Sequence, residues 1–465
     1  MKATKPKIQL IQPRHIYAPS PSESVFGHIY LPTSLITIAS VLFNGGVDIE
    51  FIDENITPNF ELSNVIGINL LGAPYIPVVK KFEKKLRNKF GNNYTLFIGG
   101  QIVNGLTQKD FTNLFSKNVL NGNNYKTLFD FFNKSIPNKL EDKTSHIPIY
   151  ELLEDNNLKY YLSNEIAFYL SQGCKFSCTF CSAERTKIIN GVRKRVTEKY
   201  RDIEIAIKDL EYLILKAKSF NLNFLTIYLS NLDLFQTPQK LREFANKVNK
   251  LLIKHGFNIR FRGLATVDSF LKVHKNHKDL INILKEIGLE RVGYGIDGAT
   301  AEVYKQTKKP QTAQMCLDAI RLTSEYSITP ETLMVFGHNN KENEESLIKA
   351  VEFSKQMLEK YNSYPRPHIS KDIVPGNDGW YDLKNKDIIK AFYNDILLFQ
   401  NLDFTALPSK FTHRDDKFRE LVSKYYIEIC ELPNSLTQYV KPINNSMSEK
   451  ELKEITNFNK YRYDL

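Results

Sequence analysis

The first 100 residues alternate short apolar runs with amphipathic segments. Apolar runs of about four to eight residues bounded by Gly, Pro or Asp indicate buried strands, whereas apolar positions repeating every three to four residues indicate helices. Strands that alternate with helices favour an α/β fold with a doubly wound, Rossmann-like parallel sheet. The pattern predicts strands at residues 7–13, 47–52, 65–71 and 94–98, and helices at residues 32–42 and 77–90.

Two pairs of residues stand where ligands of such a sheet bind, just beyond the carboxyl ends of the strands. Leu71 ends the third predicted strand and Gly72 follows it, and Gly99 and Gly100 follow the fourth. Because glycine has no Cβ, paired glycines let a large planar ligand approach the backbone closely. Glycines at these positions also serve simply as turn residues, so the sequence leaves both readings open.

A second alternating series begins at Glu165 and contains six strand–helix steps. It predicts a parallel (β/α)6 partial barrel, whose site would lie at the carboxyl end of the strands. The expected strands are residues 166–171, 224–229, 259–264, 291–296, 331–336 and 368–374, and the expected helices are residues 203–220, 238–255, 280–287, 313–326 and 344–358.

The two series divide the chain into three expected regions. Residues 1–150 form the Rossmann-like domain with a linker, and residues 151–380 form the barrel. Residues 381–465 are charged, with helical patterns at residues 386–398 and 415–430, and are expected to form a mostly helical C-terminal cap.

Composition adds little to this picture. The net charge is +11, but the lysines are scattered among acidic residues without a dense basic tract, so a nucleic-acid partner is not expected. No apolar run reaches the length of a membrane span, and the first residues do not resemble a signal peptide. We therefore expect a cytoplasmic protein.

Three of the five cysteines fall in one short stretch, as Cys174-x3-Cys178-x2-Cys181, directly after the first predicted barrel strand. Three thiolates cannot pair off in disulfides without leaving one over. A zinc site would need a fourth ligand nearby, and residues 182–185 supply none of the usual type in that loop. A four-iron cluster held by three cysteines instead keeps one iron open for another ligand.

This spacing, with the aromatic Phe180 just before the last cysteine, resembles the radical S-adenosylmethionine (SAM) superfamily. The resemblance implies that Cys174, Cys178 and Cys181 hold a 4Fe–4S cluster whose open iron binds SAM. An external one-electron reductant such as flavodoxin or ferredoxin would then drive formation of a 5′-deoxyadenosyl radical. Phe180 would pack on the adenine side.

The resemblance extends over residues 7–380. The first 140 residues resemble the cobalamin-binding domain that precedes many of these enzymes, with a good match at residues 97–100 and an imperfect one at residues 31–35. Leu71, Gly72, Gly99 and Gly100 would contact cobalamin. The Asp-x-His-x-x-Gly motif that supplies an axial histidine in some cobalamin proteins is absent, so cobalamin would bind without a histidine from that motif.

Further site residues follow from the resemblance and from their places at the strands' ends. Asn231, Asp233, Arg262 and Asp297 are expected to contact SAM. For Arg262 a structural ion pair, and for Asp297 a helix cap, are the alternatives. Tyr294 and His338 are candidate catalytic residues at the barrel mouth.

The cobalamin-containing radical SAM enzymes that this chain resembles most commonly methylate an unactivated carbon. We expect that reaction, with methylcobalamin as methyl donor, on a natural-product, peptide or lipid substrate. Ring contraction, cyclisation or epimerisation without methyl transfer is the first alternative. A cluster-bearing sensor without catalysis is the second.

Overall fold

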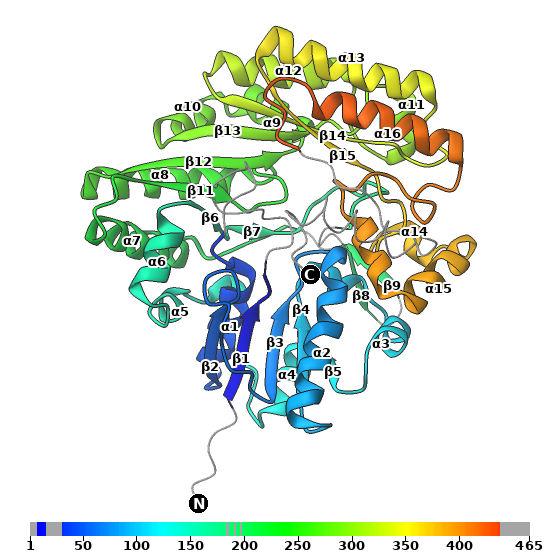
Figure 1. The fold of residues 1–465 in the computed structure, drawn as a ribbon. Helices are drawn as coiled ribbons and strands as arrows, with labels where there is room; N and C mark the ends of the chain where they lie inside the picture. The colour runs from blue at the N-terminus through cyan, green and yellow to red at the C-terminus, as the bar shows by residue number, and fades with distance from the viewer. Residues whose placement is uncertain (1–6, 15–29, 183–185, 190–191, 196–197, 438–465) are drawn as a thin grey trace, which may run out of the picture.

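The computed structural model describes residues 7–14, 30–182, 186–189, 192–195 and 198–437. Two parallel sheets dominate it, one from each of the two predicted series. The first sheet's strands end toward the second sheet, and the elements that join the two series lie between them (Figure 1). The predicted α/β class, with a Rossmann-like sheet, an open six-stranded sheet and a helical C-terminal part, is confirmed.

The first sheet has the order β2-β1-β3-β4-β5, and every neighbouring pair is parallel. Because β1 lies between β2 and β3, the winding of the sheet reverses there, and such a switch point is where doubly wound sheets bind ligands. The strands are β1 (Lys7–Gln12), β2 (Asp48–Asp53), β3 (Val65–Asn69), β4 (Thr95–Gly99) and β5 (Val119–Asn121), and the helices are α1 (Thr33–Asn44), α2 (Ile76–Phe90), α3 (Gln108–Leu114) and α4 (Tyr125–Phe131).

The second sheet has the order β15-β14-β13-β12-β11-β6, again all parallel. The described residues of β6 and β15 do not pair, so the barrel is open on one side. Its strands are β6 (Glu165–Phe168), β11 (Phe224–Leu229), β12 (Asn258–Ala265), β13 (Leu289–Gly295), β14 (Thr329–Phe336) and β15 (Tyr364–Ile369).

Helices follow the strands of the second sheet and cover its outer face (Figure 1). Two of them, α9 and α11, were not predicted from the sequence. The helices are α7 (Ile203–Ser219), α8 (Pro238–His255), α9 (Val267–Asn276), α10 (Lys278–Glu286), α11 (Ala301–Thr307), α12 (Ala313–Glu325) and α13 (Glu344–Tyr361), and α5 (Ile147–Tyr150) and α6 (Asp155–Leu162) precede them.

Two strands differ from their predictions. The last one was predicted at residues 368–374 but begins at Tyr364 and ends at Ile369. In the described sheet β15 is an edge strand next to β14, and Pro365 and Pro367 are tolerated there because an edge strand can turn proline's missing N–H away from its neighbour. The strand predicted at residues 166–171 is divided in two. Its first part is β6 in the second sheet, and its end leaves that sheet as β7 (Ser171–Gln172), which pairs with β10 (Lys199–Tyr200). Between them lies the hairpin of β8 (Thr186–Ile189) and β9 (Val192–Arg195).

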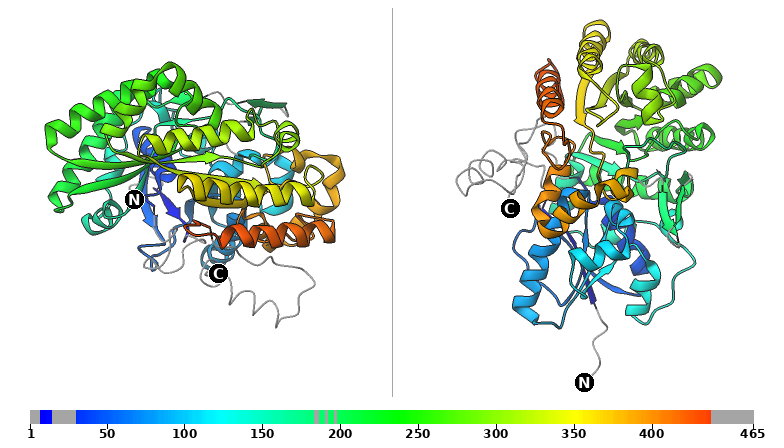
Figure 2. Two further views of the ribbon diagram at one scale, coloured as in Figure 1. Left: turned by 90° about the horizontal axis from the view of Figure 1, so that it is seen from above. Right: turned by 90° about the vertical axis from the view of Figure 1, so that its right-hand side faces the viewer.

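The C-terminal region packs on both sheets. Helix α16 (Asp416–Cys430) contacts α13 and β15, and the two helices run side by side when seen from above (Figure 2). Helices α14 (Asp378–Tyr381) and α15 (Lys386–Asn394) lie near the first sheet, and Trp380, Phe392 and Phe399 belong to the same hydrophobic core as β3, β4 and α2. Residues 438–465 of the predicted cap lie outside the described residues.

Candidate functional site

The cysteine loop, residues 173–182, follows β7 and is held by three separate parts of the barrel. The Lys175 N–H donates to Gln236 Oε1 (2.6 Å), and the Thr179 N–H donates to Thr307 O at the end of α11 (3.1 Å). Lys341, beyond β14, donates from Nζ to Thr179 Oγ1 (3.0 Å). The loop is therefore fixed against the ends of several strands rather than extending into solvent.

No disulfide joins the described cysteines. Cys178 is buried, Cys174 and Cys181 are half-buried, and burial raises the pKa of Cys174 to about 11. Within the described residues, no three Cys, His, Asp or Glu side chains converge on one metal position. As a donor set, however, three thiols in one anchored loop fit the thiolate coordination of an iron–sulfur cluster.

Phe180 packs with Cys178 and Val335, and its ring lies 5.1 Å from the ring of His338. The His338 side chain is fully buried, and its two ring nitrogens have no hydrogen-bond partner among the described residues. Nδ1 lies 3.9 Å from Asp372 Oδ1, which is too long for a hydrogen bond. His338 thus keeps unused hydrogen-bonding capacity beside the cysteine loop.

Asp372 lies beside this histidine, three residues beyond the end of β15. Burial raises the pKa of the carboxyl group, but the nearby His338 and Lys341 lower it more, so the pKa is about 2. Glu342 accepts the His338 N–H (2.7 Å), and burial raises its pKa. The backbone and the ring of His338 therefore face two acidic groups with opposite pKa shifts.

Asn231 and Asp233 are buried at the end of β11 and bonded within the barrel. Asn231 donates to Ser171 Oγ (2.7 Å). Asp233 accepts from Thr266 N–H (3.1 Å), from Thr266 Oγ1 (2.9 Å) and from Ser269 Oγ (2.5 Å), and burial raises its pKa. These contacts make Asp233 an anchor for the start of α9, next to the cysteine loop.

Arg262 forms a two-pronged ion pair with Glu165, with Nε–Oε2 and Nη2–Oε1 distances of 2.5 and 2.7 Å. Its guanidinium carbon lies 4.2 Å from the centroid of the Tyr228 ring, and Nη2 donates to the Tyr30 hydroxyl (3.2 Å). The Tyr30 hydroxyl in turn donates to Glu165 Oε1 (2.8 Å), and burial raises the pKa of Tyr30 to about 12. Arg262 was expected either to contact SAM or to form a structural ion pair, and the structure contains the ion pair.

Asp297 forms a buried ion pair with Lys309, and the cap of helix α11 is Thr300 instead. Tyr294 points to the helical layer, where its hydroxyl bonds to Thr323 Oγ1 on α12 (2.7 Å) and its ring contacts Phe270 on α9. The structure therefore directs Tyr294 away from the cysteine loop.

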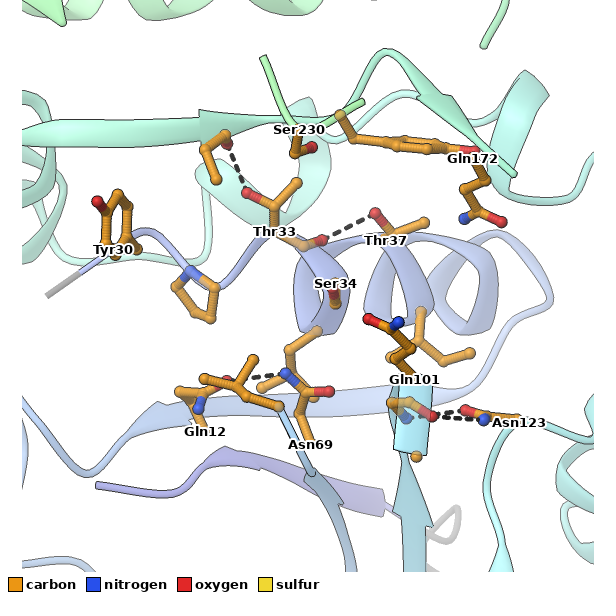
Figure 3. A pocket seen from close by; sticks show the side chains of 18 of the residues that line it. Gln12, Tyr30, Thr33, Ser34, Thr37, Asn69, Gln101, Asn123, Gln172 and Ser230 are labelled. Carbon is orange, nitrogen blue, oxygen red and sulfur yellow. Dashed lines mark hydrogen bonds between the residues drawn. The ribbon is translucent and has the colours of Figure 1, made fainter. Parts of the chain in front are cut away.

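A cavity of about 650 Å³ lies between the two sheets. On one side it is lined by Gln12, Asn69, Leu71, Gly99 and Gly100 at the ends of β1, β3 and β4, and on the other by residues of β6, β11, β12 and β15. Figure 3 shows Gln12, Asn69 and Asn123 across the cavity from Gln172 and Ser230, with Thr33 and Thr37 of α1 between them. Gly72, Phe180 and the three cysteines do not line it.

The floor of this cavity is built from amides and bare backbone. Asn69 donates to Gln12 Oε1 across the switch point (3.1 Å), and Asn123 bonds both the N–H and the carbonyl of Gly100 (2.9 and 2.8 Å). Gly100 has φ +107°, and a Cβ there would lie 2.3 Å from Leu70 O. Glycine is therefore required at this edge of the cavity.

Sequence reasoning did not find several residues of the site, among them Tyr30, Asn123, Glu165, Lys309 and Lys341. For Glu165 a signal existed, because a carboxylate at the start of an otherwise apolar strand needs a buried partner. For Lys309 and Asn123 none did, since both lie in connecting turns.

Comparisons with known proteins agree with this architecture. Residues 168–353 match the sequence model of the radical SAM superfamily. No curated protein matches the chain.

Two groups of solved structures are similar in fold. The apo form of the cobalamin-dependent S-adenosylmethionine radical enzyme OxsB has TM-score 0.57 and 13% identity, covering 98% of this chain and 71% of that one. Its form with aqua-cobalamin and SAM has TM-score 0.56 and 15% identity, covering 88% and 58%. The radical SAM methyltransferase TsrM from Kitasatospora setae has TM-score 0.51 and 11% identity, covering 78% and 72%.

The sequence match begins at the end of β6 and ends within α13. It therefore includes the cysteine loop with its three cysteines, the strands β11 to β14 and the helices between them. By this match, residues 168–353 carry a radical SAM domain.

Proposed function

We propose that this protein is a cobalamin-dependent radical SAM enzyme that methylates an unactivated carbon of a natural-product, peptide or lipid substrate. The observation that carries the proposal is a cavity that both sheets bound. A hydrogen-abstracting group and a methyl donor must both reach one carbon atom, so their two binding surfaces must face a common space.

The residues present fit the cofactors. Cys174, Cys178 and Cys181 would hold a 4Fe–4S cluster, which the match of residues 168–353 to the radical SAM superfamily implies together with SAM. The partnerless ring nitrogens of His338 beside Phe180 leave donor and acceptor capacity for a ligand on that side of the loop. Leu71, Gly99 and Gly100 would contact cobalamin at the switch point, where the amides of Gln12, Asn69 and Asn123 offer polar partners.

When bound, the cluster and SAM supply a radical that opens a C–H bond, and cobalamin supplies a methyl group. The chain's own residues position the reactants. The ion pair of Arg262 and Glu165 holds the wall of the second sheet against Tyr30, and Thr33 Oγ1 donates to Ala167 O on β6 (2.6 Å). Both contacts fix the start of α1, and hence one side of the cavity, relative to the strand that precedes the cysteine loop.

Asp233 and Asn231 hold the end of β11 in place beside that loop.

We propose residues 1–150, 151–380 and 381–465 as the three regions of the chain. The partners would be a small-molecule or peptide substrate and an external one-electron reductant such as flavodoxin or ferredoxin. In the part of the chain that the structure describes, no helix is long and apolar enough to cross a membrane.

A second candidate is a radical reaction without methyl transfer, such as ring contraction, cyclisation or epimerisation. It is favoured by the coverage of the OxsB comparison, which extends over 98% of this chain and whose name states no methyl transfer. The mass of the product separates the two candidates, because only methylation adds a CH₂ unit.

The test is anaerobic reconstitution with iron and sulfide, followed by incubation with hydroxocobalamin and then with SAM and a reductant. We expect an iron–sulfur visible spectrum, retained corrin bands after desalting, and release of 5′-deoxyadenosine. A cluster spectrum without corrin bands would overturn the cobalamin part. Cluster and corrin without 5′-deoxyadenosine would favour a non-catalytic sensor.

The cysteine assignment has a matched control in the same chain. Cys178→Ala should lose the cluster spectrum and all 5′-deoxyadenosine, because two thiolates cannot hold the cluster. Cys430→Ala, in α16 and far from the loop in sequence, should keep both. Full iron content in Cys178→Ala would refute the assignment.

A further inference from the structure

Lys309 lies in the turn between α11 and α12 with its charge inside the protein. Its side chain is only 7% exposed, and its ammonium pairs with the Asp297 carboxylate, which is 5% exposed. Gln311 of the same turn donates to the carbonyls of Gly295 and Ile296 (3.1 and 2.6 Å). The turn is thereby fixed to the end of β13, and the ion pair cannot move away into water.

The same turn touches the cysteine loop. The carbonyl of Thr307, two residues before Lys309, accepts the N–H of Thr179, which directly follows Cys178 (3.1 Å). The Lys309 ammonium is also close enough to Cys178 to interact electrostatically with its sulfur. Cys178 is the most buried of the three cysteines, at 8% exposed. The Lys309 end of the ion pair therefore lies close to Cys178.

Charges at such a place act strongly on a neighbouring redox centre. Interactions between charges weaken in water but persist in a poorly polarisable interior. One-electron reduction makes a cluster more negative, so a buried cation favours the reduced form and a buried anion opposes it. The potential of iron–sulfur clusters depends on such nearby charges and on solvent exposure.

We propose that Lys309 and Asp297 set the reduction potential of the cluster held by Cys174, Cys178 and Cys181, with the ammonium raising the potential and the carboxylate lowering it. The inference rests on the proposed function, because it needs that cluster. The step concerned is transfer of one electron from the external reductant to the cluster, without making or breaking a bond. Both residues are positioning residues, since they act through the cluster.

The test is a redox titration of the reconstituted full-length chain, without SAM, followed by electron paramagnetic resonance of the reduced cluster. Lys309→Gln leaves the carboxylate and should lower the equilibrium constant for reduction about tenfold, or about 59 mV for one electron. Asp297→Asn leaves the ammonium and should raise the potential. A purely structural role of the pair would not produce shifts of opposite sign.

Two further variants serve as controls. Lys308→Gln removes the same charge from the exposed neighbouring side chain and should leave the potential unchanged. Lys309→Arg keeps the buried charge and should restore the wild-type value. Shifts of the same sign in Lys309→Gln and Asp297→Asn, or no shift in either at full iron content, would overturn the inference.

Failure of the proposed function would look different, because the wild-type chain itself would then take up no cluster. If one of the two single variants does not fold, the other still decides, since the sign of each shift is fixed in advance.

Discussion

Arg262 carries its charge into the interior of the second sheet, where Glu165 and the Tyr228 ring enclose it. Removing one member of a buried ion pair leaves the other without compensation, which costs about 3–5 kcal/mol. We expect Glu165→Gln to lower the free energy of unfolding by that order, measured by urea denaturation. The double variant Glu165→Met, Arg262→Met should recover most of the loss. Equal losses in both variants would show that packing, not charge, makes the difference.

His368 gives a prediction about pH. The side chain lines the cavity, and burial, with a smaller contribution from Arg366, lowers its pKa to about 3. The folded protein therefore keeps this histidine neutral between about pH 6.5 and pH 3, where the unfolded chain binds a proton. Its contribution lowers stability as the pH falls through that window.

Replacing His368 by Phe removes the one proton that the unfolded chain binds at this position and the folded protein does not. The slope of unfolding free energy against pH should then become less positive by about 1.4 kcal/mol per pH unit near pH 5. Urea denaturation at several pH values measures this. An unchanged slope would mean that the ring is protonated in the folded state.

At the level of residues, the sequence predicts what depends on spacing and misses what depends on packing. Cys174, Cys178 and Cys181 lie within eight consecutive positions, so any fold of that loop brings them near one another. The hydrogen-bond partners of Arg262 come from the segment before α1 and from β6, more than 90 positions away for the nearer one. Nothing local to Arg262 specifies them.

Among the elements, the carboxyl end of β4, where Gly100 lies, offers the sharpest test of the proposed cobalamin contacts. Gly100 and Gly91 both have positive φ, but a Cβ at Gly100 would meet Leu70 O at 2.3 Å, whereas nothing lies within 4 Å of one at Gly91. Alanine should cost about 1–3 kcal/mol at either position, because both glycines have backbone angles that other residues rarely adopt. Gly100→Ala should cost more, because the backbone of β3's end must move.

That movement would change the cavity floor, so Gly100→Ala should also take up less hydroxocobalamin than Gly91→Ala. Thermal unfolding and the corrin absorbance after desalting measure the two effects. Equal corrin uptake in both variants would remove Gly100 from the proposed cobalamin contacts.

Strand and helix periodicity predicts most of the elements but not their ends. Helix α2 and strand β4 begin and end within one or two residues of expectation. β15 is displaced because its prolines are acceptable only at a sheet edge, and whether a strand lies at an edge is a property of the whole sheet. The turn of the chain from β6 into β7 depends on pairing with β10, far along the sequence.

On the scale of the whole molecule, α14 and α15 of the C-terminal region complete the hydrophobic core beside the first sheet. Phe392 is fully buried against Trp380, Phe399 and Phe411, in the hydrophobic core that also contains β3, β4 and α2. Phe392→Ala should cost about 3–5 kcal/mol through the lost contacts and the cavity left behind. It should weaken hydroxocobalamin uptake more than cluster content, because the cysteine loop belongs to the other sheet.

Leu383→Ala is the matched control, since that side chain is 71% exposed. Thermal unfolding, iron content and corrin absorbance are measured for both variants. Loss of the cluster and of cobalamin in equal proportion in Phe392→Ala would mean that the two sheets unfold as one unit.

This shared core has a consequence for the order in which the molecule is made. Domains generally fold as units as they emerge from the ribosome, at about 5–20 residues per second. The first sheet leaves the ribosome early, but the aromatic side chains of α15 that complete its interior follow on the order of tens of seconds later. The core of the second sheet is completed later still, because α16, which packs on α13 and β15, follows α15 in the chain. Neither core should therefore reach its final packing before the C-terminal region has left the ribosome.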